Sequence, residues 1–262
     1  MTESIQKFFR KYSVFSKGAF KALALVIILL AMGCAAHKAE VKSYRSAGEM
    51  YNDALKDYFK SRYEDAEKLL KNLMHQYPLS PNALDAEILL ADVFYANEEY
   101  DEARAYYTDF VALHPANPRA PYALFQKGMC YFRNVLTLDR DQASTKKALF
   151  AFQDLIREYP DSPYRARAEK LEVFLKRRLA ERELYIGRFY YKKKNFKGAL
   201  TRFRVILKEY PKAGITDETL FYIGKSYVRL GEKNLARDAF TTLIKNYPES
   251  PFARSAGKSL DG

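Results

Sequence analysis

The sequence of 262 residues has no tryptophan, two cysteines, three histidines and only 11 glycines. It also lacks the motifs of common catalytic and nucleotide-binding sites: HExxH, paired CxxC, a phosphate-binding loop and Gly-x-Ser-x-Gly are all missing. The histidines, His37, His75 and His114, lie far apart in the chain. These absences argue against hydrolases, redox enzymes and metal sites. We therefore expect a protein without enzymatic activity and without a bound cofactor.

Few glycines and only 10 prolines argue against disorder, and a hydrophobic content of 48% is enough for a core. The net charge of +12 is uneven. Residues 1–33 hold five Lys/Arg against one Asp/Glu, and residues 164–212 hold sixteen against five, so these two segments carry the whole surplus. The second segment suggests an acidic partner. Nucleic acid is not expected, because the N-terminus predicts export.

The N-terminus reads as a secretory signal. Basic residues precede the apolar run Ala22–Met32, whose eleven residues fall short of the roughly 20 that a membrane-spanning helix needs. The following "LAMGC" resembles a bacterial lipobox, which predicts a signal peptide over 1–33, lipid on Cys34 and a tether over 34–46. Ordinary signal cleavage after Gly33 is the alternative. A lipid at Cys34 would anchor the protein without spanning the membrane.

Five prolines are preceded by the same pattern. Alanine stands twelve positions before each, and large apolar or aromatic residues stand eight and five positions before it. Spacings of four and three place these residues on one face of a helix that proline cannot continue, so each proline marks a helix end. The five are Pro78, Pro115, Pro160, Pro211 and Pro248.

A second helix precedes each of these helices, because a small residue recurs 24 positions before four of the prolines and eight positions earlier, at Gly128, in the third unit. The polar stretch 134–145 lengthens the inter-helix loop of that unit, and residues 164–193 predict one long helix of about 28 residues. The predicted fold is all-α. It is an α-solenoid of five tetratricopeptide-like helix-turn-helix repeats from residue 47 to about 255, with a long connecting helix.

The first helices of stacked repeats line a concave surface, and their groove side runs one residue past each packing residue. This register leaves two alternatives for the rings on it: they pack against the next repeat, or they form a pocket for a peptide with aromatic side chains. The predicted groove residues are Tyr51, Tyr58, Asp92, Tyr95, Phe125 and Phe132.

The basic segment is the second candidate surface. A solvated charged face is one interpretation, and docking of an acidic partner is the other. Arg202 lies three residues after the packing residue Ala199, where its planar guanidinium could hold a carboxylate in a bidentate manner. The predicted partner-binding residues are Arg178, Arg188, Lys197 and Arg202. For the second cysteine, Cys130 in "GMCYF", we expect a buried free thiol.

Several stretches resemble the BamD family of tetratricopeptide lipoproteins, which belong to the outer-membrane β-barrel assembly machinery (the BAM complex). They include "AGEMYNDAL", "LDRDQ", "ALFAFQDLIREYPDSPY" and "RLAERELYIGRFYYKKKNFKGAL", and the likeness covers about residues 34–250. The resemblance implies a non-enzymatic scaffold, anchored through Cys34 to the outer membrane and facing the periplasm. A generic periplasmic tetratricopeptide adaptor, acting on peptidoglycan or cell-division proteins, is the alternative.

The resemblance also implies partners. Repeats in 47–163 would bind the aromatic-ended C-terminal signal of unfolded outer-membrane proteins. The region 164–262 would bind the last periplasmic domain of BamA, and Arg202 matches a family arginine that meets an acidic residue there. Other lipoproteins of the machinery are further expected partners.

Overall fold

A computed structural model describes residues 45–135, 137–138 and 140–260, and the described chain from Ser46 onward forms one compact unit. This part contains helices and no strand, which confirms the all-α prediction. The predicted signal peptide and Cys34 lie outside the described residues. The helices are α2 (Ala47–Phe59), α3 (Tyr63–Gln76), α4 (Pro81–Ala96), α5 (Tyr100–Leu113), α6 (Ala120–Arg133), α7 (Ala143–Glu158), α8 (Arg165–Lys192), α9 (Phe196–Glu209), α10 (Thr216–Leu230), α11 (Lys233–Asn246) and α12 (Pro251–Leu260).

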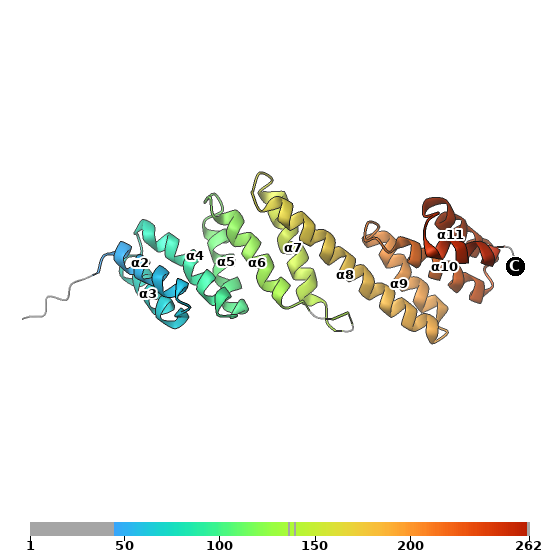
Figure 1. The fold of residues 1–262 in the computed structure, drawn as a ribbon, viewed down its shortest axis with the longest axis horizontal. Helices are drawn as coiled ribbons and strands as arrows, with labels where there is room; N and C mark the ends of the chain where they lie inside the picture. The colour runs from blue at the N-terminus through green and yellow to red at the C-terminus, as the bar shows by residue number, and fades with distance from the viewer. Residues whose placement is uncertain (1–44, 136, 139, 261–262) are drawn as a thin grey trace, which may run out of the picture. The chain divides into compact units, whose positions relative to one another are not determined.

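Each helix packs against the next one along the chain (Figure 1). The pairs α2/α3, α4/α5, α6/α7, α8/α9 and α10/α11 form the five predicted repeats. The longer loop of the third repeat, between Arg133 and Ala143, and the 28-residue helix α8 are also confirmed. A final helix, α12, packs on α10 and α11 and ends the stack.

The predicted packing residues form the core. In all five second helices, the alanine and the two large residues that follow it are at most 4% exposed. Glycines of the first helices lie under the rings of the second: a Cβ added at Gly187 would lie 2.3 Å from Phe203, and one at Gly224 would lie 2.4 Å from Phe240. The third repeat has the same contact between Gly128 and Phe152. A small residue is therefore required wherever the paired helices approach this closely.

The recurring "YP" and "SP" pieces end one helix and begin the next. The residue before the proline has an extended-type φ near −130°, as at Tyr77 and Tyr159, because proline disfavours helical geometry in its predecessor. Three residues after Tyr77, Ser80 donates its N–H to the Tyr77 carbonyl and accepts from the Asn82 N–H at 3.2 Å. Pro81 then occupies the first turn, where no intrahelical donor is needed.

The short turns between paired helices place one residue in the left-handed region at the same register in four repeats. After each of these residues, the next N–H donates to a carbonyl five positions back, as from Glu232 to Tyr227 at 3.0 Å. Only the last repeat uses glycine. The four residues, with φ of 57°, 64°, 60° and 76°, are Ser61, Glu98, Lys194 and Gly231.

Gly231→Ala is therefore expected to lower the free energy of unfolding by about 1 kcal/mol, since a Cβ is strained at this φ. The matched control is Gly257→Ala in the last helix. A Cβ there meets nothing within 4 Å, and alanine should raise stability by about 0.5–1 kcal/mol. Urea unfolding of both variants measures the difference. A shift of the same sign in both would contradict the assignment of strain to Gly231.

Helix α8 joins two cores. Leu175 and Leu179, in its middle, pack in the cluster that includes Phe125 and Phe152 of the third repeat. Ala180 and Leu184, immediately after, pack in the cluster of α9 and α10. At 1.5 Å per residue the helix is about 42 Å long. It therefore belongs both to the third repeat, as a following helix, and to the fourth, as its first helix.

Candidate protein-binding surfaces

The predicted groove of the N-terminal repeats contains the carboxylate of Asp92. Asp92 of α4 accepts hydrogen bonds from the hydroxyls of Tyr107, at 2.5 Å, and Tyr122, at 2.6 Å. Gln126 donates in turn to the Tyr122 hydroxyl at 3.1 Å. Burial raises the pKa of Asp92 above its usual value of 3.8, although both hydrogen bonds act to lower it. Burial and the nearby Asp92 charge also raise the pKa of Tyr58, on the open side of the network.

Removing the Asp92 carboxylate is expected to destabilise the second repeat. Asp92→Ala leaves the fully buried Tyr107 hydroxyl without its acceptor, which costs roughly 1–3 kcal/mol. Asp92→Asn is the matched control, because its amide oxygen can still accept. Because the pKa of Asp92 is raised in the folded state, the protonated carboxyl group stabilises the folded wild type below about pH 4. This stabilisation is lost as the pH rises through the folded-state pKa of Asp92.

The stability of Asp92→Asn relative to the wild type should therefore increase from pH 4 towards neutrality. Thermal melts across this range measure the difference. Equal pH profiles for the two proteins would show that Asp92 does not titrate as its burial implies.

Three of the predicted groove rings, Tyr58, Tyr95 and Phe132, are half-buried. Tyr58 packs on Tyr63 with ring centroids 6.2 Å apart, and Tyr95 packs on Tyr100 at 5.3 Å. Phe132, the third member, packs on Phe174 of α8 at 5.8 Å. The rings thus pack within the protein and still keep one accessible side each.

Phe125 and Tyr51 differ from one another in exposure. Phe125 is 2% exposed and stacks on Tyr164 at 5.4 Å, so it is a core residue and not a groove contact as we had predicted. The helical register fails here because α8 follows the third repeat closely and covers this position. Tyr51 remains half-exposed, and its pKa is raised by burial and then by the charge of Asp85. Arg119 pairs with that carboxylate at 2.8 Å.

The predicted partner-binding residues do not form a single patch. Arg202 of α9 pairs with Glu183 of α8 at 3.3 Å, and its side chain is 40% exposed. Arg188 instead pairs with Glu218 of α10 at 3.2 Å and lies over the Tyr222 ring. Glu183 and Arg188 are five positions apart on one helix, or about 140° around it, so the two arginines lie on opposite flanks of α8.

Of the remaining two, Lys197 is exposed in the first turn of α9 and Arg178 is half-buried on α8. Burial raises the pKa of Glu218, and the neighbouring Arg188 opposes this shift. The Arg202 flank and the Arg188 flank are thus two separate candidate contacts.

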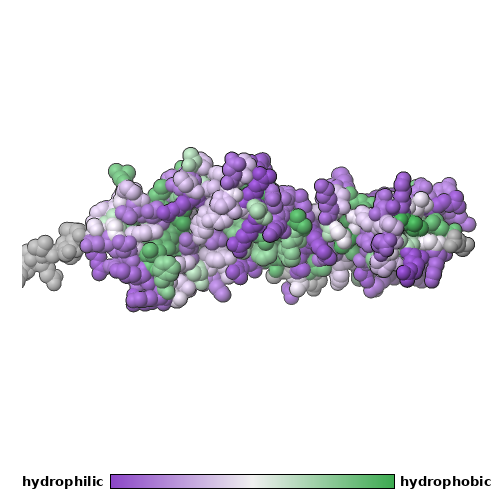
Figure 2. Space-filling model, turned by 45° about the horizontal axis from the view of Figure 1, so that its top comes forward, coloured by the Kyte–Doolittle hydropathy of each residue, from purple (hydrophilic) through white to green (hydrophobic). Residues whose placement is uncertain are grey.

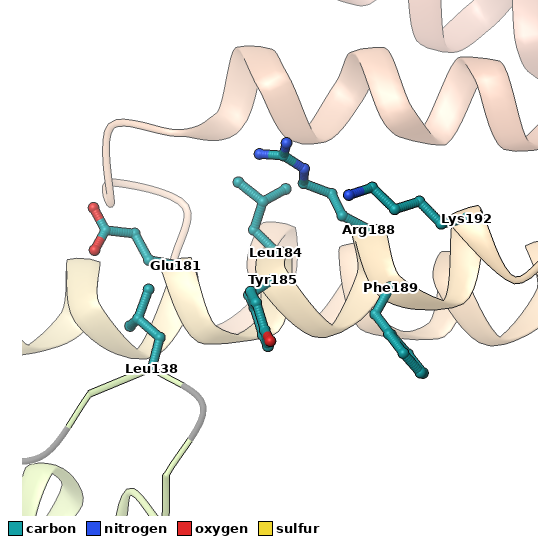
Figure 3. Close-up of a pocket in the computed structure, with 7 residues that line it drawn as sticks. All are labelled: Leu138, Glu181, Leu184, Tyr185, Arg188, Phe189 and Lys192. Atoms are coloured by element: carbon teal, nitrogen blue, oxygen red, sulfur yellow. The ribbon is translucent and has the colours of Figure 1, made fainter.

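The exposed face of α8 carries a cavity of about 430 Å³ that sequence reasoning missed. Tyr185 and Phe189, 53% and 52% exposed, lie one helical turn apart and point towards the side of Leu138, while the Arg188 guanidinium extends the other way (Figure 3). Figure 2 shows hydrophobic residues gathered over the N-terminal repeats and again over the middle of the chain, where α6 to α8 lie. Exposed aromatic rings beside cations are typical of protein-binding surfaces.

The loop that contributes Leu138 is held by polar side chains. Buried Gln142 donates to the Thr137 carbonyl at 3.0 Å and accepts from the Thr145 hydroxyl at 2.9 Å. Arg182 reaches from α8 to the carbonyls of Leu138, at 3.0 Å, and Arg140. Asp141 adds a third contact, because its carboxylate accepts from the Ala143 N–H at 3.1 Å.

Other chemistry is sparse in the described part of the chain. Cys130 is 1% exposed, as predicted, and burial raises its pKa to about 12, so the thiol is unreactive. The His114 Nε2 atom, at the C-terminal end of α5, lies 3.3 Å from the Glu87 Oε2 atom. Among the described residues no group of His, Cys, Asp or Glu could hold a metal ion, and no helix there has the length and apolar character of a transmembrane span.

The stacked helix pairs define a solenoid of tetratricopeptide-like repeats that carries these polar and aromatic surfaces. The chain belongs to the YfiO family of outer membrane lipoproteins, whose family model matches residues 44–242. Its long helix and all but the end of its last repeat lie within that match. Family membership associates the protein with the outer membrane.

Relatives named outer membrane protein assembly factor BamD agree with this placement. The protein of Caulobacter vibrioides is 27% identical over 86% of this chain and 75% of its own length. That of Rickettsia prowazekii is 29% identical over 86% of this chain and 90% of its own length, and that of Neisseria meningitidis serogroup A is 29% identical over 85% and 87%. Among solved structures, the TPR2AB-domain:pHSP90 complex of yeast Sti1 is 14% identical over 82% of both chains, with a TM-score of 0.47.

Proposed function

We propose that the protein is a lipid-anchored scaffold of the outer-membrane β-barrel assembly machinery, attached through Cys34 and facing the periplasm. The family match across all five repeats carries this proposal. The relatives' name, outer membrane protein assembly factor, supports the process. We expect a covalent lipid on Cys34 and no other bound group.

BamA docks at the Arg202 flank of α8 and α9. Arg202 is partly exposed, and its in-chain partner Glu183 lies at 3.3 Å, a distance at which a carboxylate from BamA can compete. Lys197 lies on the same helix and adds to the positive field. Arg178 and Arg188 serve the other face of α8, which suits a further lipoprotein of the machinery.

The N-terminal repeats bind the C-terminal signal of unfolded outer-membrane proteins. Half-buried rings at Tyr51, Tyr58, Tyr95 and Phe132 offer apolar contact, and the tyrosine hydroxyls and the Asp92 network offer hydrogen-bonding groups. Such a mixture fits an extended peptide with aromatic side chains.

Affinity purification of the tagged full-length protein from detergent-extracted membranes tests the proposal. Recovery of BamA together with unfolded barrel proteins is the expected result. Recovery of peptidoglycan-binding or cell-division proteins without BamA would instead favour a generic periplasmic adaptor. Mass spectrometry of the mature N-terminus tests the anchor, because an unmodified Cys34 or cleavage elsewhere would overturn it.

A further inference from the structure

Two leucines are exposed on the loops that join the first three repeats. Leu79, between α3 and α4, is 97% exposed, and Leu113, at the end of α5, is 70% exposed. Both lie beside exposed prolines and an exposed alanine, and neither loop contains an acidic residue. The apolar edge, as we name this set, consists of Pro78, Leu79, Pro81, Leu113, Pro115 and Ala116.

The apolar edge adjoins the point where the folded chain begins. Paired helices in each repeat are antiparallel, so the loops after the second helices lie at the same edge as the start of α2. The first turns of α2 and α4 lie close together, because a Cβ added at Gly48 of α2 would lie 3.9 Å from the Asn82 side chain of α4. Leu79 is three residues before Asn82.

The other repeats supply an internal comparison. The position of Leu79 in the first "YP-x-SP" piece is held by Asp161 in the third repeat and by Glu249 in the fifth. The position of Leu113, two before the proline, is held by Glu158 in the third repeat. The position equivalent to Leu79 in the fourth repeat is held by Lys212, so the same loop carries apolar residues near the chain start and charged residues farther along.

We propose that the apolar edge rests on the lipid bilayer. This inference rests on the proposed lipid at Cys34. Only residues 35–45 separate that cysteine from the N-cap Ser46, and the twelve steps from Cys34 to Ser46 span at most about 40 Å when fully extended. The tether thus holds the start of α2, and the apolar edge beside it, within about 40 Å of the membrane surface.

The chemistry of the edge fits the headgroup region of a bilayer. Leucine and proline side chains gain from leaving water, and the loops carry no carboxylate that lipid phosphates would repel. The loop backbone is already satisfied internally, since Ser80 donates to the Tyr77 carbonyl at 3.0 Å and Asn117 to the His114 carbonyl at 3.0 Å. Exposed Arg119 follows the second loop and pairs with Asp85 at 2.8 Å, so a lipid phosphate would have to compete with that carboxylate for it.

Lipid-borne quenching of a fluorophore tests the contact. The lipidated full-length protein, with Leu79→Cys labelled by an environment-sensitive dye, is reconstituted in phosphatidylethanolamine and phosphatidylglycerol vesicles. Cys130 is buried and does not compete for the dye. Asp161→Cys is the matched control at the equivalent loop position. We expect a blue-shifted emission and several-fold stronger quenching by lipid-attached quenchers at position 79 than at position 161.

The outcomes separate the inference from the anchor on which it rests. A vesicle-bound, lipidated protein with equal quenching at positions 79 and 161 overturns the apolar edge and leaves the anchor intact. A protein that does not sediment with vesicles overturns the anchor and the inference together. A blue shift at position 79 that appears only after addition of purified machinery would show that a partner protein, and not lipid, covers the edge.

Discussion

Phe203→Ala is expected to lower the free energy of unfolding by about 3–5 kcal/mol. The ring is fully buried and fills the space beside Gly187, where no side chain of α8 is available to replace it. Because stacked repeats depend on their neighbours, the loss should appear first in the fourth repeat.

Urea unfolding measures the total effect, and hydrogen exchange of α8 and α9 shows where it acts. Thr201→Ala, exposed on the same helix, is the matched control and should change stability by less than about 0.5 kcal/mol. The pair Gly187→Leu with Phe203→Ala should cost less than the sum of the two single changes, because the leucine enters the cavity that the ring leaves. Strict additivity would show that the two positions do not share a packing site.

Helix periodicity was sufficient to predict the repeats. The alanine and the two large residues before each proline report which face is buried, and this local pattern fixed the register of all five second helices. The long α8 followed from a stretch without helix breakers. The recurring small residue located the helix that contains Gly187, but the contact of Gly187 with Phe203 came only from the structure.

The candidate surfaces were only partly predictable, because pairings between distant residues leave no periodic signal. Phe125 had the register of a groove residue, yet Tyr164, 39 positions later, covers it. Arg182 lies in a segment whose composition suggests a solvated basic face, yet its guanidinium donates to the Leu138 carbonyl and holds that loop. The cavity on α8 depends on that loop, and so it could not be expected from either segment alone.

Charge alone did not show how the predicted partner-binding residues are distributed over the surface. The sixteen basic residues of 164–212 suggested one positive surface, but in-chain carboxylates divide it. Arg188 forms an ion pair with Glu218, and Arg202 forms one with Glu183, on opposite sides of α8. The functional division between 47–163 and 164–262 stays a prediction, since α8 packs into the cores of both regions.

Arg202→Glu is expected to weaken binding of the BamA periplasmic domain by about 100-fold, if Arg202 meets a carboxylate there. The in-chain pair with Glu183 is partly exposed, so its loss should cost less than about 1 kcal/mol in stability. Binding and folding are therefore separable at this position. Titration of the purified periplasmic domain onto the immobilised scaffold measures the affinity, and circular dichroism checks the fold.

Two variants of Glu183 make the test specific. The charge swap, Arg202→Glu with Glu183→Arg, restores the in-chain pair but moves the positive charge from α9 to α8, so binding should stay weak. Glu183→Gln leaves Arg202 in place without its in-chain competitor, so binding should be as tight as in the wild type or tighter. If the charge swap bound BamA as tightly as the wild type does, binding would depend on the net charge of this flank. The proposed contact at the position of Arg202 would then be wrong.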